Sequence, residues 1–152
     1  LSLYSKLIVS VMKIEDPWEL LENETSRSKF INREISKHMN EYEILFEKID
    51  KLKPTKEKIF QVYLPPTKNS YTSTISNYLI YKYPEKVIMV IRQNEEKVIM
   101  SLRSTKTKLP DAISTALEGL DGFGGGHELA CGAGVAKDQF PEFFERLQSQ
   151  LI

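Results

Sequence analysis

Residues 122–132 read Gly-Phe-Gly-Gly-Gly-His-Glu-Leu-Ala-Cys-Gly, and they are the most informative stretch of this 152-residue chain. All seven glycines lie between Gly119 and Gly134, and the first 118 residues contain none. Glycine loses more conformational entropy on ordering than any other residue. So dense a cluster therefore indicates a backbone geometry, or a close approach to the backbone, that a Cβ atom would block.

The three consecutive glycines Gly124, Gly125 and Gly126 are followed directly by His127. Such a segment turns bare backbone N–H groups toward one point, and a histidine beside them can donate a hydrogen bond to a phosphate oxygen. If a short helix begins at His127, its amino end adds partial positive charge. The alternative is a flexible surface loop with an incidental histidine. A Walker phosphate loop is excluded because no Gly-Lys-Ser/Thr follows, and a predicted helix before the glycines disfavours a dinucleotide-binding fingerprint.

A second candidate group is Ser101-Leu-Arg-Ser104, at the end of a predicted strand. The guanidinium of Arg103 between the hydroxyls of Ser101 and Ser104 suits phosphate recognition. The alternative is an exposed strand end with a solvated arginine. An α/β unit could bring this strand end and the glycine loop together on one rim of a sheet.

Hydrophobic periodicity predicts an α/β fold. Apolar residues recur at helical spacing over residues 26–50, and Pro54 ends that pattern. The elements that we expect after it are a strand (58–64), a helix (69–81), a hairpin (86–92 and 97–103), a helix (109–120), the glycine loop, a strand (132–136) and a helix from Asp138 with a stripe of phenylalanines and leucines. We therefore predict a mixed β-sheet of four to five strands with flanking helices, preceded by a long N-terminal connector helix. We expect residues 1–56 to form a helical connector region and residues 57–152 to form a separate domain.

Composition and charge exclude several classes of protein. Lys plus Arg equals Asp plus Glu at 21 each, so the chain is not a uniformly basic nucleic-acid binder, although residues 82–108 carry seven cations against three anions. The single cysteine, Cys131, excludes an intramolecular disulfide framework and fits a reducing, cytoplasmic compartment. The sequence contains no run of 18 apolar residues, so it predicts no membrane span. Because the chain opens on Leu1 rather than methionine, we expect a fragment of a longer protein.

The sequence shows no motif for the hydrolysis of a phosphoester. No cluster of histidine and aspartate has the spacing that holds a divalent metal, so we predict neither a metal site nor a catalytic residue in this chain. We expect Cys131 to be buried and inert; the alternative is a nucleophilic thiol paired with His127. The sequence thus indicates a domain that holds phosphate without cleaving it.

Residues 124–132, Gly-Gly-Gly-His-Glu-Leu-Ala-Cys-Gly, resemble the Gly-Gly-Gly-His-x-x-Ala-Ala/Cys-Gly signature of the DHH-associated domain, the C-terminal half of DHH phosphoesterases. Ser101-Leu-Arg-Ser104 resembles the family's Ser-x-Arg-Ser strand. The resemblance covers roughly residues 57–152. Members include the RecJ single-strand exonucleases, their archaeal relatives and oligoribonucleases, and the Ala-Cys-Gly ending is most similar to archaeal RecJ-like proteins.

The resemblance implies a division of labour between two halves of the parent protein. A catalytic half, absent here, carries an Asp-His-His motif with two divalent metals, expected to be Mn²⁺ or Mg²⁺. Residues Gly124, Gly125, Gly126 and His127 then contact the phosphate nearest the scissile bond. Arg103, with Ser101 and Ser104, contacts the same or the adjacent phosphate. The helix at 26–50 resembles the connector between the two halves.

The function that we expect from this resemblance is binding of single-stranded DNA or RNA for a metal-dependent phosphoesterase, most similar to a RecJ-like exonuclease of DNA repair. The fragment alone is expected to be inactive as a hydrolase. One alternative is a catalytically inert interaction domain in a replication or repair complex, docking through the phenylalanine-rich C-terminal helix. Another is a binding domain for a small phosphoester or a short oligoribonucleotide. The expected partners are therefore nucleic acid, the catalytic DHH domain and replication or repair proteins, with no membrane.

Overall fold

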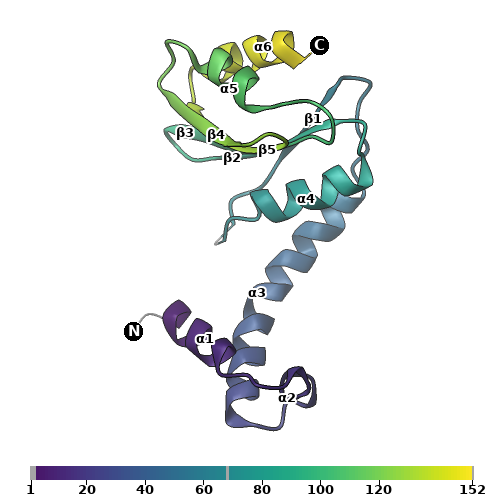
Figure 1. Cartoon of the computed structure of the whole chain (residues 1–152), viewed down its shortest axis with the longest axis vertical. Helices are drawn as coiled ribbons and strands as arrows, with labels where there is room; N and C mark the ends of the chain where they lie inside the picture. Colours follow the sequence, from purple (N-terminus) through teal and green to yellow (C-terminus); the bar gives the residue numbers. More distant parts are fainter. Residues whose placement is uncertain (1–2, 68, 152) are drawn as a thin grey trace. The chain divides into compact units, whose positions relative to one another are not determined.

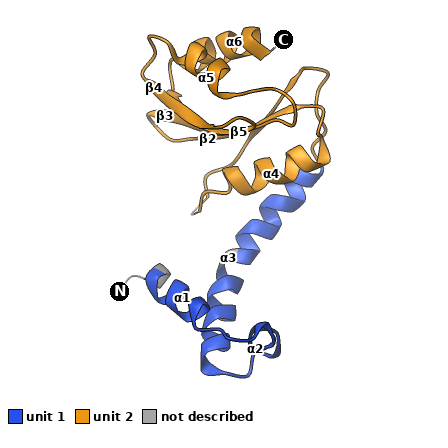
Figure 2. Cartoon of the chain, in the orientation of Figure 1, with its two compact units in different colours: residues 1–51 blue, residues 52–152 orange. Residues whose placement is uncertain are grey.

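The computed structural model describes residues 3–67 and 69–151, which fall into two compact units. Unit 1 comprises residues 1–51 and unit 2 residues 52–152 (Figure 2). The predicted boundary after residue 56 lies in the same segment, between the last helix of unit 1 and the first strand of unit 2.

Unit 1 is helical. Helix α1 spans Leu3–Met12, α2 spans Pro17–Glu22 and α3 spans Ser26–Asp50. Asp16 caps helix α2: its Oδ1 accepts a hydrogen bond of 3.0 Å from the Trp18 backbone N–H, and Pro17 occupies the first turn. The long helix predicted at 26–50 is confirmed as α3. Helix α1 had no predicted counterpart.

Unit 2 is a mixed five-stranded sheet with helices on both faces, which confirms the predicted fold class (Figure 1). Its elements are β1 (Ile59–Tyr63), α4 (Thr72–Lys82), β2 (Val87–Gln93), β3 (Lys97–Arg103), α5 (Pro110–Leu117), β4 (Gly122–His127), β5 (Ala130–Ala136) and α6 (Phe140–Leu151). The strand order is β1-β2-β3-β5-β4. Strands β1 and β2 are parallel, and every other neighbouring pair is antiparallel. The predicted hairpin is therefore the pair β2–β3.

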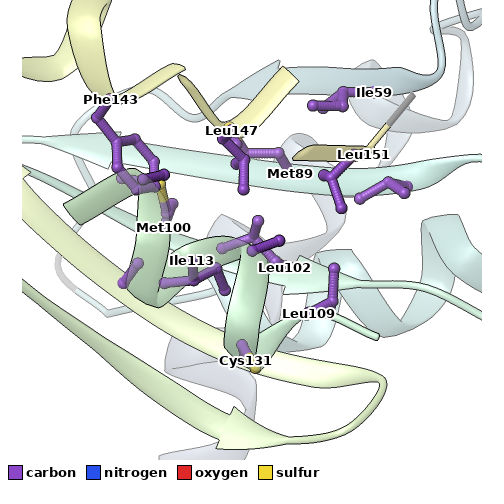
Figure 3. Packing of buried hydrophobic residues seen from close by; sticks show 14 of the residues in the cluster. Ile59, Met89, Met100, Leu102, Leu109, Ile113, Cys131, Phe143, Leu147 and Leu151 are labelled. Atoms are coloured by element: carbon purple, nitrogen blue, oxygen red, sulfur yellow. The ribbon is translucent and has the colours of Figure 1, made fainter. Parts of the chain in front are cut away.

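The hydrophobic core lies between the sheet and the helices α5 and α6 (Figure 3). Alternate residues of the strands face it, among them Met89, Met100 and Leu102, each at most 1% exposed. Phe143 and Leu147 of α6 are fully buried against this face, as the predicted stripe requires. Helix α4 covers part of the opposite face of the sheet (Figure 1).

The glycine segment differs from the prediction. Residues 122–127 form edge strand β4, paired with β5 along its whole length, and no helix begins at His127. Glycine has little intrinsic preference for strands, so the segment looked like a loop. The glycines are needed for packing instead. A Cβ atom at Gly124 would lie 2.5 Å from Ile113 Cγ2, and one at Gly122 would lie 2.6 Å from Leu117 Cδ2. Helix α5 can thus lie directly on β4.

Candidate functional site

His127 and Arg103 lie on the same face of the sheet. Ala130 of β5 pairs with Arg103 of β3 on one side and with His127 of β4 on the other, so the three residues form one row across the sheet. Cys131, the next residue of β5, is buried in the core beneath α5, and side chains alternate along a strand. This row therefore faces away from the core, on the side that α4 partly covers. Strand spacing puts the two flanking Cα atoms about 10 Å apart.

The neighbouring row on this face has almost no side chains. Ser101 pairs with Gly132, which pairs with Gly125. A Cβ atom at Gly125 would meet nothing within 4 Å, and one at Gly132 would meet only the Met100 carbonyl oxygen, at 3.9 Å. Both glycines are exposed. We name Gly125 and Gly132 the bare strip; here a ligand can contact the backbone itself.

Arg103 is held in place by three hydrogen bonds. Its Nε donates to Asn77 Oδ1 of α4 at 2.8 Å, and its Nη1 donates to the carbonyl oxygens of Leu102 at 2.8 Å and Cys131 at 3.3 Å. Among the described residues, no hydrogen bond engages Nη2. Burial lowers the pKa of this guanidinium, which nevertheless remains protonated at neutral pH. The result is a fixed, partly desolvated cation with donor capacity left for an anion.

Helix α4 adds two residues that sequence reasoning did not identify. Ser73 Oγ lies 3.4 Å from Ser101 Oγ, and Asn77 accepts from Arg103 as described above. The two residues are one helical turn apart, and both are exposed. In the sequence, these two polar residues are spaced four apart on a helix whose other stripe is apolar, and this spacing indicates a polar stripe. It did not reveal which strand the polar stripe faces.

The β4–β5 hairpin tip is anchored to the loop between β3 and α5. The carbonyl oxygens of Leu129 and Glu128 accept from the backbone N–H groups of Ser104 at 3.0 Å and Leu109 at 2.9 Å. Lys108 Nζ lies 2.6 Å from Glu128 Oε1, a hydrogen bond that raises the pKa of the lysine. These contacts fix the strand end that carries His127.

Ser104 is buried, and its hydroxyl serves the same loop. Its Oγ accepts from the backbone N–H groups of Thr107 at 2.8 Å and Lys106 at 3.2 Å. These are the contacts of a turn-forming serine. The role predicted for Ser104 in binding phosphate stays a prediction, while the role visible in its contacts is to shape the loop beside the site.

The three central glycines do not share one face. Gly125 lies in the bare strip, whereas missing side chains at Gly124 and Gly126 make room on the core side. Gly126 has a φ of 145°, and a Cβ atom there would lie 2.5 Å from the Ala130 carbonyl oxygen and 2.9 Å from Cys131 Cα. The structure thus gathers Ser101, Arg103, Gly125 and His127 around one surface. It gives Gly124 and Gly126 a packing role.

Cys131 is buried, as predicted, and lies on the core side of β5. Its Sγ donates to the His127 backbone carbonyl oxygen at 3.2 Å. Burial raises the pKa of the thiol, and the charge of Arg103 opposes that shift. Since the imidazole of His127 belongs to the opposite face, the alternative of a Cys131–His127 nucleophilic pair does not fit this geometry.

Among the side chains that the structure describes, no three His, Cys, Asp or Glu are grouped so as to hold a metal ion. Every helix within residues 3–67 and 69–151 is too short or too polar to cross a bilayer.

The family model of the DHHA1 domain matches residues 56–152. No curated protein matches the chain significantly. The fold is similar to RecJ from Thermus thermophilus in complex with Mg²⁺, with a TM-score of 0.67 and 15% identity over 95% of this chain and 22% of that one. It is similar to the C-Ala domain of Aquifex aeolicus alanyl-tRNA synthetase, with a TM-score of 0.53 and 17% identity over 66% of this chain and 96% of that domain.

A third similar structure is PggH, a pGpG-specific phosphodiesterase from Vibrio cholerae, with a TM-score of 0.58 and 13% identity over 99% of this chain and 51% of that one. The chain therefore spans about a fifth of RecJ and about half of PggH. Identities this low establish a shared fold.

Proposed function

Because residues 56–152 make this chain a member of the DHHA1 domain family, we propose that the face of its sheet carrying Arg103 and His127 binds the phosphodiester backbone of single-stranded nucleic acid. In this proposal the chain is the substrate-binding part of a DHH-type phosphoesterase similar to RecJ. The whole protein's partners would be single-stranded DNA or RNA and its own catalytic half.

The observation that supports this proposal best is the row Arg103–Ala130–His127 beside the bare strip. Two groups that can carry positive charge flank a methyl group, and the adjacent row offers open backbone. A phosphate placed between them would accept from the Arg103 guanidinium on one side and from the imidazole on the other. The small residues between them leave space for the sugar–phosphate chain.

The proposed chemistry of this chain is binding and positioning. The RecJ structures hold Mg²⁺ or Mn²⁺, and we expect a metal of this kind in the catalytic half of the parent, where it would activate water. The part of this chain that the structure describes offers no three-residue metal site. Arg103 and His127 would orient the phosphate and neutralise charge on it.

The interaction-domain alternative rested on the phenylalanines of α6. Phe143 is fully buried, and Phe140 and Phe144 pack against the same core. Core packing accounts for these rings, so α6 supplies no observation that favours a docking role. The small-phosphoester alternative has support of a different kind, because PggH is described as pGpG-specific. A dinucleotide is therefore included among the test ligands.

The test is a fluorescence-anisotropy titration of wild type, Arg103→Ala and His127→Ala with a labelled single-stranded oligonucleotide, competed by pGpG and by pyrophosphate. We expect each variant to lose roughly tenfold in affinity, as for a charge-assisted hydrogen bond. In Arg103→Ala, which loses a cation, the slope of log affinity against log salt should become shallower by about 0.7, the value for one single-strand phosphate contact.

Arg146→Ala is the matched control. This arginine of α6 belongs to the opposite face of the sheet, where it contacts Glu142 and the Glu118 carbonyl oxygen. Its removal changes the net charge equally, so the affinity should stay within twofold of wild type. Wild-type affinity in both site variants would refute the proposed function, and pyrophosphate competing as well as oligonucleotide would favour a small-phosphoester domain.

A further inference from the structure

Along the strand direction the bare strip has two ends. One end carries Arg103 and His127, and neither of these residues reaches the other end. The next row on this face runs Arg92–Ile99–Gly134–Phe123, from β2 to β4. Phe123 lies four residues before His127 on the same strand, which corresponds to about 13 Å. That distance is beyond the reach of a single phosphate bound at His127. A ligand that occupies both ends must carry more than one phosphate group or a base.

Phe123 is held against the sheet and is nevertheless exposed. The Cβ position of Gly134 lies 2.6 Å from Phe123 Cζ, so the ring covers the backbone of a glycine on the neighbouring strand. The same position lies 2.8 Å from Ile99 Cδ1, which places the ring edge beside Ile99 of β3. Still, 57% of Phe123 is accessible to solvent. One side of the ring therefore packs on the sheet, and the rest is free for a planar partner.

Ile99 also links the ring to a hollow. A cavity of about 250 Å³ is lined by Pro66, Thr67, Arg92, Gln93, Asn94 and Ile99. Arg92 is half-buried there. Among the described residues, its guanidinium makes no hydrogen bond and no ion pair. An arginine that the described residues leave unpaired at the edge of a cavity can bind a phosphate group of a ligand. This observation is independent of the exposed ring and points to the same end of the strip.

We propose that Phe123 and Arg92 form a second subsite that binds the neighbouring nucleotide, with its base on the Phe123 ring and its phosphate beside Arg92. This inference rests on the proposed function, because the first phosphate must be bound at Arg103 and His127. It narrows the ligand to a phosphodiester with nucleobases and at least two nucleotides. Stacking on one phenylalanine tolerates every base, so the subsite selects length rather than sequence.

The experiment compares two ligands of equal length, a short single-stranded oligonucleotide and the same strand with abasic residues in place of its bases. Phe123→Ala should lower affinity for the base-bearing strand roughly tenfold and leave affinity for the abasic strand within twofold of wild type. Phe123→Leu keeps an apolar cover on Gly134 without an aromatic face and should lose a similar amount. Phe123→Trp should bind at least as tightly as wild type. Arg92→Ala should weaken both strands and flatten the salt dependence by about 0.7.

Two variants serve as controls. Tyr63 is an exposed aromatic residue of β1, 55% accessible, and it shares the core-side face of the sheet with Ile59 because the two residues are four apart on one strand. Tyr63→Ala removes an equally exposed ring from that other face and should bind both strands as wild type does. Arg146→Ala provides the charge control. Melting temperature and circular dichroism of every variant confirm that the fold is retained.

The outcomes separate the two proposals. If Arg103→Ala weakens both strands while Phe123→Ala and Phe123→Leu bind the base-bearing strand as wild type does, the second subsite is refuted and the proposed function stands. If Arg103→Ala has no effect on either strand, the proposed function itself fails. Equal losses for the two strands in Phe123→Leu would also refute stacking, because the abasic strand has nothing to place on the ring.

Discussion

The two faces of strand β5 are used in opposite ways. On one face Cys131, Ala133 and Val135 are buried beneath α5 and α6, in contact with large apolar side chains. On the other face the same strand presents Ala130, Gly132 and Gly134, and only the last of these is buried. One strand thus supports a dense core and, one residue out of step, an open backbone surface.

The two faces show that side chains stabilise the core face, whereas the absence of side chains on the open face leaves space for a ligand. On the core face each buried apolar group adds to stability through burial and close contact. On the open face the missing side chains remove nothing from that core, and they leave room for a ligand to reach the backbone. The comparison predicts that the core face is destabilised when a side chain is removed, or when one is added where there is no room for it. On the open face, an added side chain should impair binding rather than folding. Three substitutions test it, in order of their expected effect on the free energy of unfolding.

Phe143→Ala should have the largest effect. The ring is 0% exposed and belongs to the central cluster between the sheet and α6 (Figure 3). Its loss leaves a cavity and should lower the free energy of unfolding by about 3–5 kcal/mol, measured by urea denaturation. Phe144→Ala, one residue along the same helix and only partly buried, is the control and should cost clearly less. Equal losses for the two variants would show that α6 does not bury the face assigned to it.

Gly126→Ala should be the next most harmful. Here the added methyl group is the damage, because the φ of 145° is one that side chains rarely adopt and the Cβ atom would contact Ala130 and Cys131. We expect a loss of about 2–4 kcal/mol in the free energy of unfolding. Because Ala130 and His127 close the hairpin, the imidazole should also be displaced, and oligonucleotide affinity should fall. Stability equal to wild type would contradict the backbone geometry given for the β4–β5 hairpin.

Much of this fold could be predicted from periodicity alone. The spacing in α3 and the two apolar runs of the β2–β3 hairpin are local signals, and both elements formed where the sequence indicated. Strand β4 could not be found in this way, because its glycines carry no strand preference and the strand is specified by its partner β5 and by the close approach of α5.

The residues of the candidate site likewise fall into those that the sequence could indicate and those that it could not. Arg103 and His127 stand out by residue type, and the register of three strands then places them in one row. Asn77 and Phe123 could not be assigned beforehand. The importance of Asn77 depends on which strand α4 covers, and that of Phe123 on the register of the β4–β5 hairpin, which places the ring opposite Gly134. Such relations between elements exist only once the sheet has formed.

Gly132→Val should have the smallest effect on folding and a large effect on binding. The backbone of Gly132 is not among those with positive φ, and a Cβ atom there would have open space above the sheet. Valine favours strands and glycine does not, so the free energy of unfolding should stay within about 1 kcal/mol of wild type. The new side chain would, however, stand in the bare strip between Ser101 and Gly125, where the sugar–phosphate chain is proposed to lie. Oligonucleotide affinity should fall by roughly tenfold or more, since the ligand could no longer approach the backbone.

Ala133→Val is the opposite substitution, one residue along and on the filled face, and should destabilise the fold through overpacking. A Gly132→Val protein that folds and binds as wild type does would mean that the open face is merely unoccupied surface and that the ligand lies elsewhere.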